Sequence, residues 1–386
     1  MQQIKLKTFG IDVGESKIVV TKIKLEQQGE QLIERESETR EFKYDNEGIQ
    51  QLINFLGDYK EGIMEATGVY FYYLYDKLTQ KGYNIGVVNP LQLREILGKK
   101  TDELDSKRLA LAYAIGVIKT SYIPKENERE LRELERHRKQ LEERITQLKN
   151  MIRKTLQTAG YKIEPFNKEG RQILDKLVKG QELTNEEKEK LKNLLGRKLN
   201  KGEVLILKQL VEEMNMVEGQ VKEIDDMIAT LIPKATLAEL LKIPGIGFTT
   251  ASTILGEVGD ISRFSNSKAF CSYAGLSPRT KQSGEFLSHN GLIPGNKYLR
   301  RVFFLAARVA VRVDGKFNEF YTRIKERSGS GKKALVAVAN KLARIVFHVL
   351  HDGVYKGDSK KVVRVRKGRE PSVDGDLTLS SALDKL

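Results

Sequence analysis

Cysteine and tryptophan are almost absent from this chain of 386 residues, which has one cysteine, Cys271, and no tryptophan. One thiol excludes an internal disulfide framework and a cysteine-rich zinc site, and it favours a reducing, intracellular location. No run approaches the ~18 apolar residues that a membrane span needs. The N-terminus begins with charge and lacks the apolar stretch of a signal peptide. We therefore expect a cytoplasmic protein with no membrane partner.

Acidic residues are outnumbered by basic ones, 52 Asp and Glu against 67 Lys and Arg, which gives a formal net charge of +15. Such an excess points to a polyanionic partner, most simply nucleic acid, but it says nothing about chemistry. The length predicts two or three domains, at the usual ~100–200 residues per domain.

The first part of the chain alternates between strand and helix patterns, which predicts an α/β domain over residues 1–122. Residues 7–25 contain two strand patterns joined by a tight turn. Further strands are expected in 61–68 and 83–90, and helices in 49–59, 69–82, 91–100 and 102–118.

The middle of the chain, residues 123–235, predicts long helices. Glycine and proline are absent from about Glu126 to Gln157, and apolar residues fall on heptad positions that Arg138 interrupts once. A second, cleaner series alternates spacings of three and four and ends before Pro233: Leu207, Leu210, Met214, Val217, Val221, Ile224, Ile228 and Leu231. Short helices are expected in 160–200. Heptads predict a coiled coil but do not name its partner, so a hairpin within one chain and pairing between chains both stay open.

The last part predicts a mostly helical domain over residues 236–353, with glycine-rich turns, and a basic, disordered tail over 354–386. The segment IPGIG, at 243–247, lies between two helical stretches, as in a helix-hairpin-helix motif. Backbone amides at Gly245 and Gly247 can bind a DNA phosphate in such a turn. An ordinary helix–helix turn explains the same pattern.

Four carboxylates form the first candidate site. Asp12 lies within an apolar strand, Glu65 follows a short apolar run, and Asp102 and Asp105 share one face at the start of a helix. If they converge, they form the oxygen-only site that Mg²⁺ prefers, and metals held in this way support phosphoryl transfer. Each acid alone also has a structural explanation: Asp12 fits a turn, Glu65 a buried acid with satisfied hydrogen bonds, and Asp102 a helix N-terminus. Actin-like ATPases and sugar kinases have a similar first strand, but the N-terminal part lacks the glycine-rich phosphate loops that they require.

Ser283 is the second candidate, because it lies next to a glycine and among cations. A serine there can attack a phosphodiester whose charge the cations stabilise. Ser272, Ser277 and Ser288 compete on composition alone, and from chemistry alone a turn role explains Ser283 better than a nucleophilic one. The cations expected to contact DNA are Arg279, Lys281, Lys297, Arg300 and Arg301.

Taken together, these segments resemble one family, the DEDD-type bacterial insertion-sequence recombinases, which are bridge-RNA-guided transposases related to the pilin-gene invertases. The motifs match in order over about residues 7–350: GIDVG, MEATGVY, VVNP, KKTDELDSKRLA, IPGIG, SYAGLSPR, QSGE and GNKYLRR. Two residues depart from the pattern. Ser106 stands where alanine is common, and Pro294 where lysine is often found.

The resemblance implies a RuvC-like N-terminal domain with an RNase H fold, in which Asp12, Glu65, Asp102 and Asp105 bind Mg²⁺. It implies that Ser283 forms a covalent link to DNA. It further implies a cytoplasmic bacterial recombinase that acts on donor and target DNA with a structured guide RNA. The expected assembly is a tetramer, a dimer of dimers, whose active sites combine the RuvC-like domain of one subunit with the serine domain of another.

Two other functions remain open. A RuvC-like structure-specific endonuclease that uses metal-activated water needs the carboxylates but not Ser283. A non-catalytic nucleic-acid-binding scaffold needs neither, and would use only the long helices and the basic surface.

Overall fold

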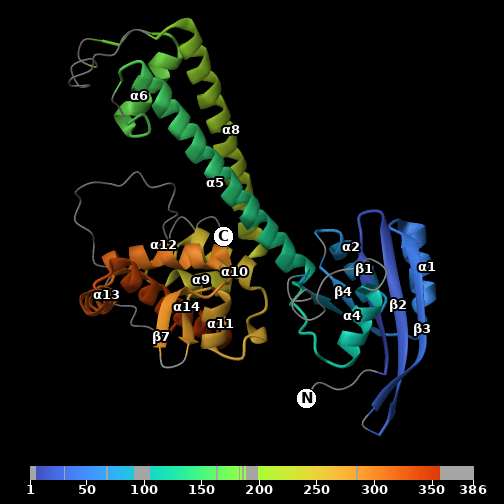
Figure 1. The fold of residues 1–386 in the computed structure, drawn as a ribbon. Helices are drawn as coiled ribbons and strands as arrows, with labels where there is room; N and C mark the ends of the chain where they lie inside the picture. The colour runs from blue at the N-terminus through green and yellow to red at the C-terminus, as the bar shows by residue number, and fades with distance from the viewer. Residues whose placement is uncertain are drawn as a thin grey trace. The chain divides into compact units, whose positions relative to one another are not determined.

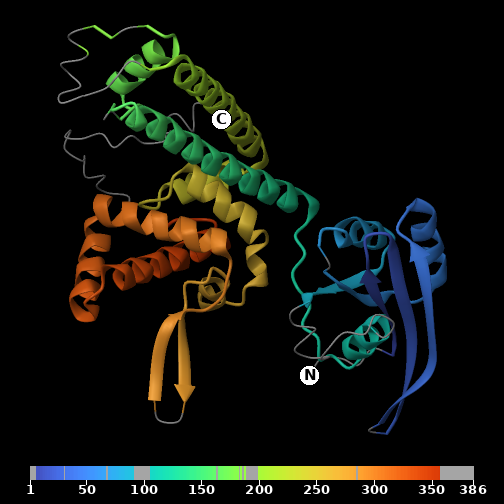
Figure 2. The same cartoon turned by 45° about the horizontal axis from the view of Figure 1, so that its top comes forward.

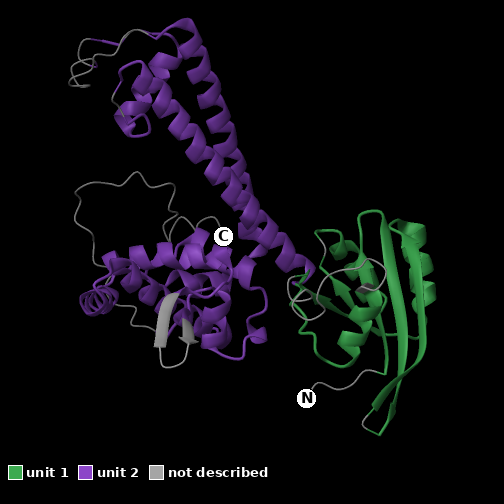
Figure 3. Cartoon of the chain, in the orientation of Figure 1, with its two compact units in different colours: residues 1–123 green, residues 124–386 purple. Residues whose placement is uncertain are grey.

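The chain forms two compact units, which meet between Ile123 and Pro124 (Figure 3). The computed structural model describes residues 6–29, 31–66, 68–90, 105–161, 164–181, 183–184, 187, 199–283 and 286–356, without the side chains of 105 and 280–290. The helix expected in 91–100 and all but three residues of the expected tail lie outside these ranges. The boundaries expected for the individual domains, 1–122, 123–235, 236–353 and 354–386, stay predictions.

Unit 1 is built on a five-stranded mixed sheet with the order β3-β2-β1-β4-β5 (Figure 1). The strands are β1 (Lys7–Val13), β2 (Lys17–Gln28), β3 (Gln31–Lys43), β4 (Glu61–Glu65) and β5 (Asn84–Val88). β1, β2 and β3 pair antiparallel, whereas β4 and β5 continue the sheet parallel to β1. The carboxyl ends of β1, β3, β4 and β5 therefore lie at the same end of the sheet, which we call its carboxyl edge.

Helices cover both faces of this sheet, which confirms the predicted α/β class. On one face, α1 (Asn46–Leu56) and α2 (Phe71–Gln80) bury Leu52 and Leu74 against Ile11. On the other face, α4 (Asp105–Ala114) packs against Ile63 and Ile23. Alternate residues of β1 and β2 serve the two faces, as the two-residue period of a strand requires.

Unit 2 begins with two long helices, α5 (Glu126–Thr158) and α8 (Lys201–Leu231), which lie alongside each other (Figures 1 and 2). Both helices were expected from their apolar spacing. Heptad residues of α8 are buried within this one chain: Leu207, Leu210, Met214, Val217 and Ile228. The short helix α6 (Lys168–Val178) packs against the same core through Ile173 and Leu177.

The rest of unit 2 is mostly helical around one apolar core. Its helices are α9 (Lys234–Leu241), α10 (Phe248–Val258), the 3₁₀ turn η1 (Ile261–Arg263), α11 (Ser267–Tyr273), α12 (Lys297–Val313), α13 (Gly315–Ser328) and α14 (Gly331–Asp352). A β-hairpin, β6 (Pro278–Ser283) with β7 (Phe286–Leu292), interrupts the helices between α11 and α12. The sequence pattern did not predict these two strands.

Within the described residues, α14 is the one helix long and apolar enough to span a membrane. It packs against α11, α12 and α13, and Val338, Leu342 and Val346 on it are fully buried in the core of unit 2. These contacts account for its apolar composition.

Candidate functional site

Two of the predicted acids, Asp12 and Glu65, lie on neighbouring strands at the carboxyl edge of the unit 1 sheet. The parallel register pairs Ile11 of β1 with Met64 of β4, and each acid is the next residue on its strand. Residues at equivalent positions of parallel strands point to the same face of the sheet. Glu65 is only 2% exposed, and Asp12 is half-buried. The fold thus directs two carboxylates to one face at one edge.

Gly10 shows which helix covers that face. It lies two residues before Asp12 and therefore on the same side of β1. A Cβ atom at Gly10 would lie 2.0 Å from the carbonyl oxygen of Ser106 and 2.7 Å from the backbone nitrogen of Ala110. The first turns of α4 therefore lie directly over β1, at a separation that only glycine allows.

Strand β4 gives the same result. Ile63 lies two residues before Glu65 and is buried together with Leu109 of α4. Glu65 therefore belongs to the α4 face as well. Because α4 begins at Asp105, the backbone at Asp105 lies on the side of the sheet to which Asp12 and Glu65 point.

The structure tests the predicted metal site only in part. Asp102 lies outside the described residues, and for Asp105 the structure describes the backbone but not the side chain. Among the described side chains, no three His, Cys, Asp or Glu residues come close enough to hold a metal. The chemistry of the donors nevertheless suits a hard divalent cation, because Asp12 and Glu65 offer only carboxylate oxygens and Glu65 is buried.

The structure accounts for Ser106, one of the two departures from the family pattern. Its side chain is 1% exposed, and its Oγ lies 2.7 Å from Oγ1 of Thr21. Thr21 in turn lies 2.8 Å from Oγ1 of Thr39 on β3. The extra hydroxyl is therefore buried but hydrogen-bonded, so we expect little loss of stability relative to alanine.

Ser283 is the last residue of β6. The antiparallel register places it opposite Phe286, and Lys281 opposite Ser288. The side chains of Ser283 and Lys281 lie outside the described part of the chain, so the structure gives their backbone positions only. The competing serines are Ser272 in α11, Ser277 before β6 and Ser288 on β7.

The segments that flank the hairpin meet through two glycines. A Cβ atom at Gly295 would lie 2.5 Å from the Cα of Gly275, and Gly275 has a φ of +66°. The Asn296 backbone N–H donates a hydrogen bond to the Tyr273 backbone carbonyl at 2.7 Å. The glycines of SYAGLSPR and GNKYLRR are thus required for a close backbone contact at the base of the hairpin.

A buried carboxylate, Glu257 on α10, ties these segments to α5. Its side chain accepts hydrogen bonds from Arg136, Nε to Oε1 at 2.7 Å and Nη2 to Oε2 at 3.0 Å. Asn296 donates from Nδ2 to Oε2 at 2.6 Å, and the Tyr273 hydroxyl donates to the Glu257 backbone carbonyl at 3.2 Å. The residues before and after the hairpin therefore contact one fully buried acid. Sequence reasoning missed Glu257, because nothing in the helical pattern distinguishes it.

The IPGIG segment joins α9 to α10 as a tight turn. Gly245 has a φ of +84°, and a Cβ atom there would lie 2.3 Å from the Ala306 carbonyl oxygen on α12. Gly247 is the N-cap of α10. Packing against α12 is sufficient to require glycine at 245, and the predicted phosphate contact at Gly245 and Gly247 stays a prediction.

The predicted cations have different surroundings. Arg300 is partly buried and donates from Nη2 to the Ile293 carbonyl at 2.9 Å, where it supports the hairpin base. Arg301 lies 3.5 Å from Glu143, and 47% of its side chain is exposed. Arg279 and Lys297 are exposed.

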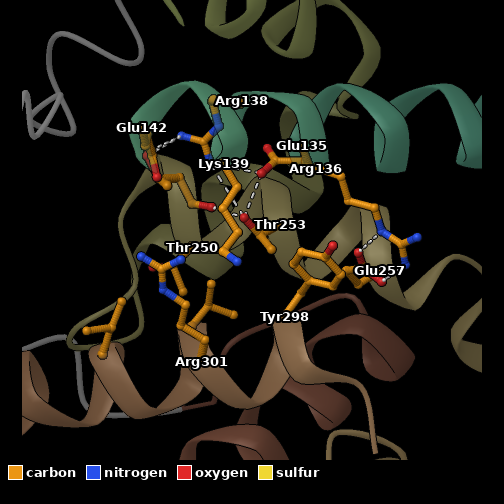
Figure 4. A pocket seen from close by; sticks show the side chains of 13 residues that line it. Glu135, Arg136, Arg138, Lys139, Glu142, Thr250, Thr253, Glu257, Tyr298 and Arg301 are labelled. Atoms are coloured by element: carbon orange, nitrogen blue, oxygen red, sulfur yellow. Dashed lines mark hydrogen bonds and ion pairs between the residues drawn. The ribbon is translucent and has the colours of Figure 1, made fainter. Parts of the chain in front are cut away.

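A small cavity of about 80 Å³ lies between α5, α10 and α12 (Figure 4). Arg138, the residue that interrupts the heptads, is 3% exposed there and donates to Glu135 at 2.8 Å and Thr249 at 2.9 Å. Burial raises the pKa of the neighbouring Glu142. Ligand pockets usually measure roughly 300–1,000 Å³, so this cavity is too small for a nucleotide. Its charged groups instead connect α5 to α10 through Arg138 and Arg136.

Two family models match the chain. One, described as a transposase of the DEDD IS110 type, covers residues 9–160. The other, described as the Transposase IS116/IS110/IS902 family, covers residues 237–322. The chain belongs to the IS110 family of transposases. The first match contains Asp12, Glu65, Asp102 and Asp105, and the second contains Ser283 and Glu257, so both candidate regions of this IS110-family chain fall within matched segments.

Several curated relatives are similar over part of their length. An uncharacterized 43.6 kDa protein of insertion element IS110 from Streptomyces coelicolor is 30% identical over 39% of this chain and 38% of its own. The pilin gene-inverting protein of Moraxella bovis is 31% identical over 36% of this chain and 44% of its own. The transposase for insertion sequence element IS1328 of Yersinia enterocolitica is 33% identical over 39% and 46%. The matched segments thus span less than half the length of these relatives.

Among solved structures, the chain matches Fowlpox virus resolvase, solved with its substrate Holliday junction DNA. The match has a TM-score of 0.22 and 13% identity, and it covers 29% of this chain and 99% of the resolvase. At this TM-score the likeness adds nothing to the topology described above.

Proposed function

We propose that this protein is a DNA recombinase of an insertion sequence, which cuts and rejoins DNA strands. Unit 1 acts as a RuvC-like domain with an RNase H fold, and unit 2 supplies a nucleophilic serine. The observation that carries the proposal is the register of β1 and β4, which directs Asp12 and Glu65 to the face where α4 begins. Membership of the IS110 family and the net charge of +15 support it.

Asp12, Glu65, Asp102 and Asp105 are the residues that hold Mg²⁺ in this proposal. A divalent cation held by these residues would supply positive charge that offsets the charge of the phosphate. The protein contributes an edge of the sheet where one carboxylate is almost completely buried. Burial of an ionised acid requires a cation or hydrogen bonds to compensate its charge, and a divalent cation is the compensating group in this proposal.

Ser283 is the proposed nucleophile. Its Oγ forms a bond to phosphorus as the bond from phosphorus to a sugar oxygen breaks. The serine proton is released to water, and the sugar oxygen takes up a proton. The phosphodiester energy is kept in the serine–DNA link, so the reverse step with another strand rejoins DNA without a further energy source. Arg279, Lys281 and Lys297 stabilise the charged phosphate.

We extend the proposal to assembly and guidance, as the family resemblance implies. The resemblance implies that a complete site forms when the carboxylates of one subunit meet the serine of another. A tetramer, arranged as a dimer of dimers, supplies such pairs. A structured guide RNA selects donor and target DNA, and the excess of basic residues suits two nucleic acid partners.

Metal-dependent cutting of element-end DNA tests the carboxylate site. Asp12→Asn and Glu65→Gln keep the side-chain shapes but remove the charges, so we expect both to abolish cutting while DNA binding remains. Binding should weaken steeply between ~50 and ~200 mM salt, because phosphate contacts release counterions. Full cutting by both variants would contradict the proposed site. Cutting that needs Asp12 but not Ser283 would favour the endonuclease that uses water.

A further inference from the structure

An exposed cluster of tyrosines lies at the carboxyl edge of the unit 1 sheet. We define the tyrosine cluster as Tyr44, Val69, Tyr70 and Tyr73. Val69 is 73% exposed, Tyr70 38% and Tyr73 46%, whereas Phe71 between them is 4% exposed and packs in the core. The start of α2 thus anchors the Phe71 ring in the core and leaves the rings of Tyr70 and Tyr73 partly exposed. Grouped exposed apolar side chains of this kind mark interaction sites.

Backbone contacts fix the cluster at the edge that carries the carboxylates. The Tyr44 amide donates to the Ser16 carbonyl at 3.0 Å, in the turn between β1 and β2. The Tyr44 hydroxyl donates to the Tyr70 carbonyl, and the Tyr73 hydroxyl donates to Asn46 Oδ1 at 3.1 Å. The ends of β1 and β3 and the start of α2 therefore meet here. Because α2 follows β4 closely, the cluster adjoins the end of the strand that carries Glu65.

The chemistry of the cluster suits a nucleotide. The hydroxyls of Tyr44 and Tyr73 are already used within the protein, so the ring surfaces are what remains for a ligand. Lys77 Nζ lies 5.3 Å from the centre of the Tyr73 ring. The N-terminus of α2 has no side-chain cap and no acidic residue in its first turn, which leaves its positive dipole end uncompensated. Aromatic faces beside positive charge are how proteins hold unpaired bases and their phosphates.

We propose that the tyrosine cluster stacks on an unpaired nucleobase of the DNA strand that is cut at the carboxylates. Ligands of sheets with this kind of strand-to-helix connection bind outside the carboxyl ends of the strands, where both features lie. The inference rests on the proposed function, because it takes the carboxylate edge as the place where DNA is cut. It adds a contact to the base, which the acids alone do not provide.

Fluorescence of 2-aminopurine tests the contact separately from cutting. The probe is a branched DNA duplex with 2-aminopurine at an unpaired position beside the branch, mixed with the full chain in EDTA. Stacking on tyrosine should quench its fluorescence. Tyr70→Ala and Tyr73→Ala should each reduce the quenching and weaken binding by about tenfold, whereas Tyr73→Phe should retain both.

Ile115→Ala is the matched control. Ile115 is 49% exposed and follows Ala114, which packs with Leu25 at the opposite end of the sheet. It should bind the probe like the wild type. Unchanged quenching and affinity in both tyrosine-to-alanine variants would overturn the proposal. So would a loss of self-association in those variants, measured by sedimentation, with DNA binding intact. Loss of quenching in the tyrosine variants, together with cutting that survives Asp12→Asn, would instead contradict the proposed function and leave the stacking contact standing.

Discussion

The guanidinium of Arg136 binds both carboxylate oxygens of Glu257, a residue 121 positions further along the chain. Glu257 is fully buried, whereas 41% of the Arg136 side chain is exposed. The pair joins α5 to α10, and Asn296 extends it to the start of α12. The base of the segment that carries Ser283 is thus connected to the long helix α5 through Glu257, which also has Arg132 of α5 at 3.8 Å.

Arg136→Ala should destabilise the protein by about 2 kcal/mol, because it removes two charge-assisted hydrogen bonds from a buried acid. The matched control is Arg144→Ala, on the same helix. Arg144 pairs with Glu213, and these side chains are 44% and 34% exposed, so we expect a loss below about 1 kcal/mol. Denaturant unfolding of both variants measures the difference. Equal losses would show that the Glu257 pair contributes no more than a surface pair.

Gly10→Ala should lower the stability of unit 1 by about 2–3 kcal/mol, because the new methyl group collides with backbone atoms of α4. Displacement of α4 also moves Asp105 away from β1, so metal-dependent cutting should fall further than stability alone accounts for. Gly219→Ala provides the contrast. It lies within α8 with open space around its Cβ position, and we expect a gain of about 0.5–1 kcal/mol. Thermal melting of both variants tests the opposite signs.

Glu142→Gln should stabilise the protein at neutral pH. Burial raises the pKa of Glu142, so this carboxyl binds a proton more tightly in the folded protein than in the unfolded protein. The stability that this carboxyl contributes is therefore fully present below its ordinary pKa of about 4.5 and is lost as pH rises through the raised value. The glutamine variant lacks this loss. Its melting temperature should exceed that of the wild type at pH 7, and the difference should disappear near pH 4. A constant difference across this range would contradict the assignment.

Helices and strands whose apolar residues recur at a regular spacing could be predicted from the sequence, whereas β3 and the hairpin of β6 and β7 could not. Strands β1 and β2 and helices α1 and α5 carry apolar residues at spacings that match a strand or a helix. β3 is an edge strand, and Phe42 is its one buried residue. Between Ile33 and Phe42 all of its residues are polar, on both faces of the strand. Its pairing with β2, and not its composition, makes it a strand. Charged residues of this kind also protect an exposed edge.

Those site residues could be predicted whose signal lies within a short stretch of sequence. Asp12 stands out because an acid inside an apolar strand is unusual. The sequence could not show that Glu65 lies beside it, since the pairing of β1 with β4 joins segments about fifty residues apart. Glu257 and Arg138 were harder still. Arg136 lies 121 residues from Glu257 and Thr249 lies 111 residues from Arg138, and burial gives a charged residue no sequence signature.

The central claim is that Ser283 links covalently to DNA with the help of the carboxylates. The measurement is denaturing electrophoresis of the protein after incubation with labelled element-end DNA, RNA from the flanking region and Mg²⁺. We expect a protein–DNA adduct that survives detergent and is absent from Ser283→Ala and from Asp12→Asn, whereas Ser288→Ala, on the neighbouring strand, retains it. Cut DNA without an adduct, or an adduct that persists in Ser283→Ala, would contradict the claim.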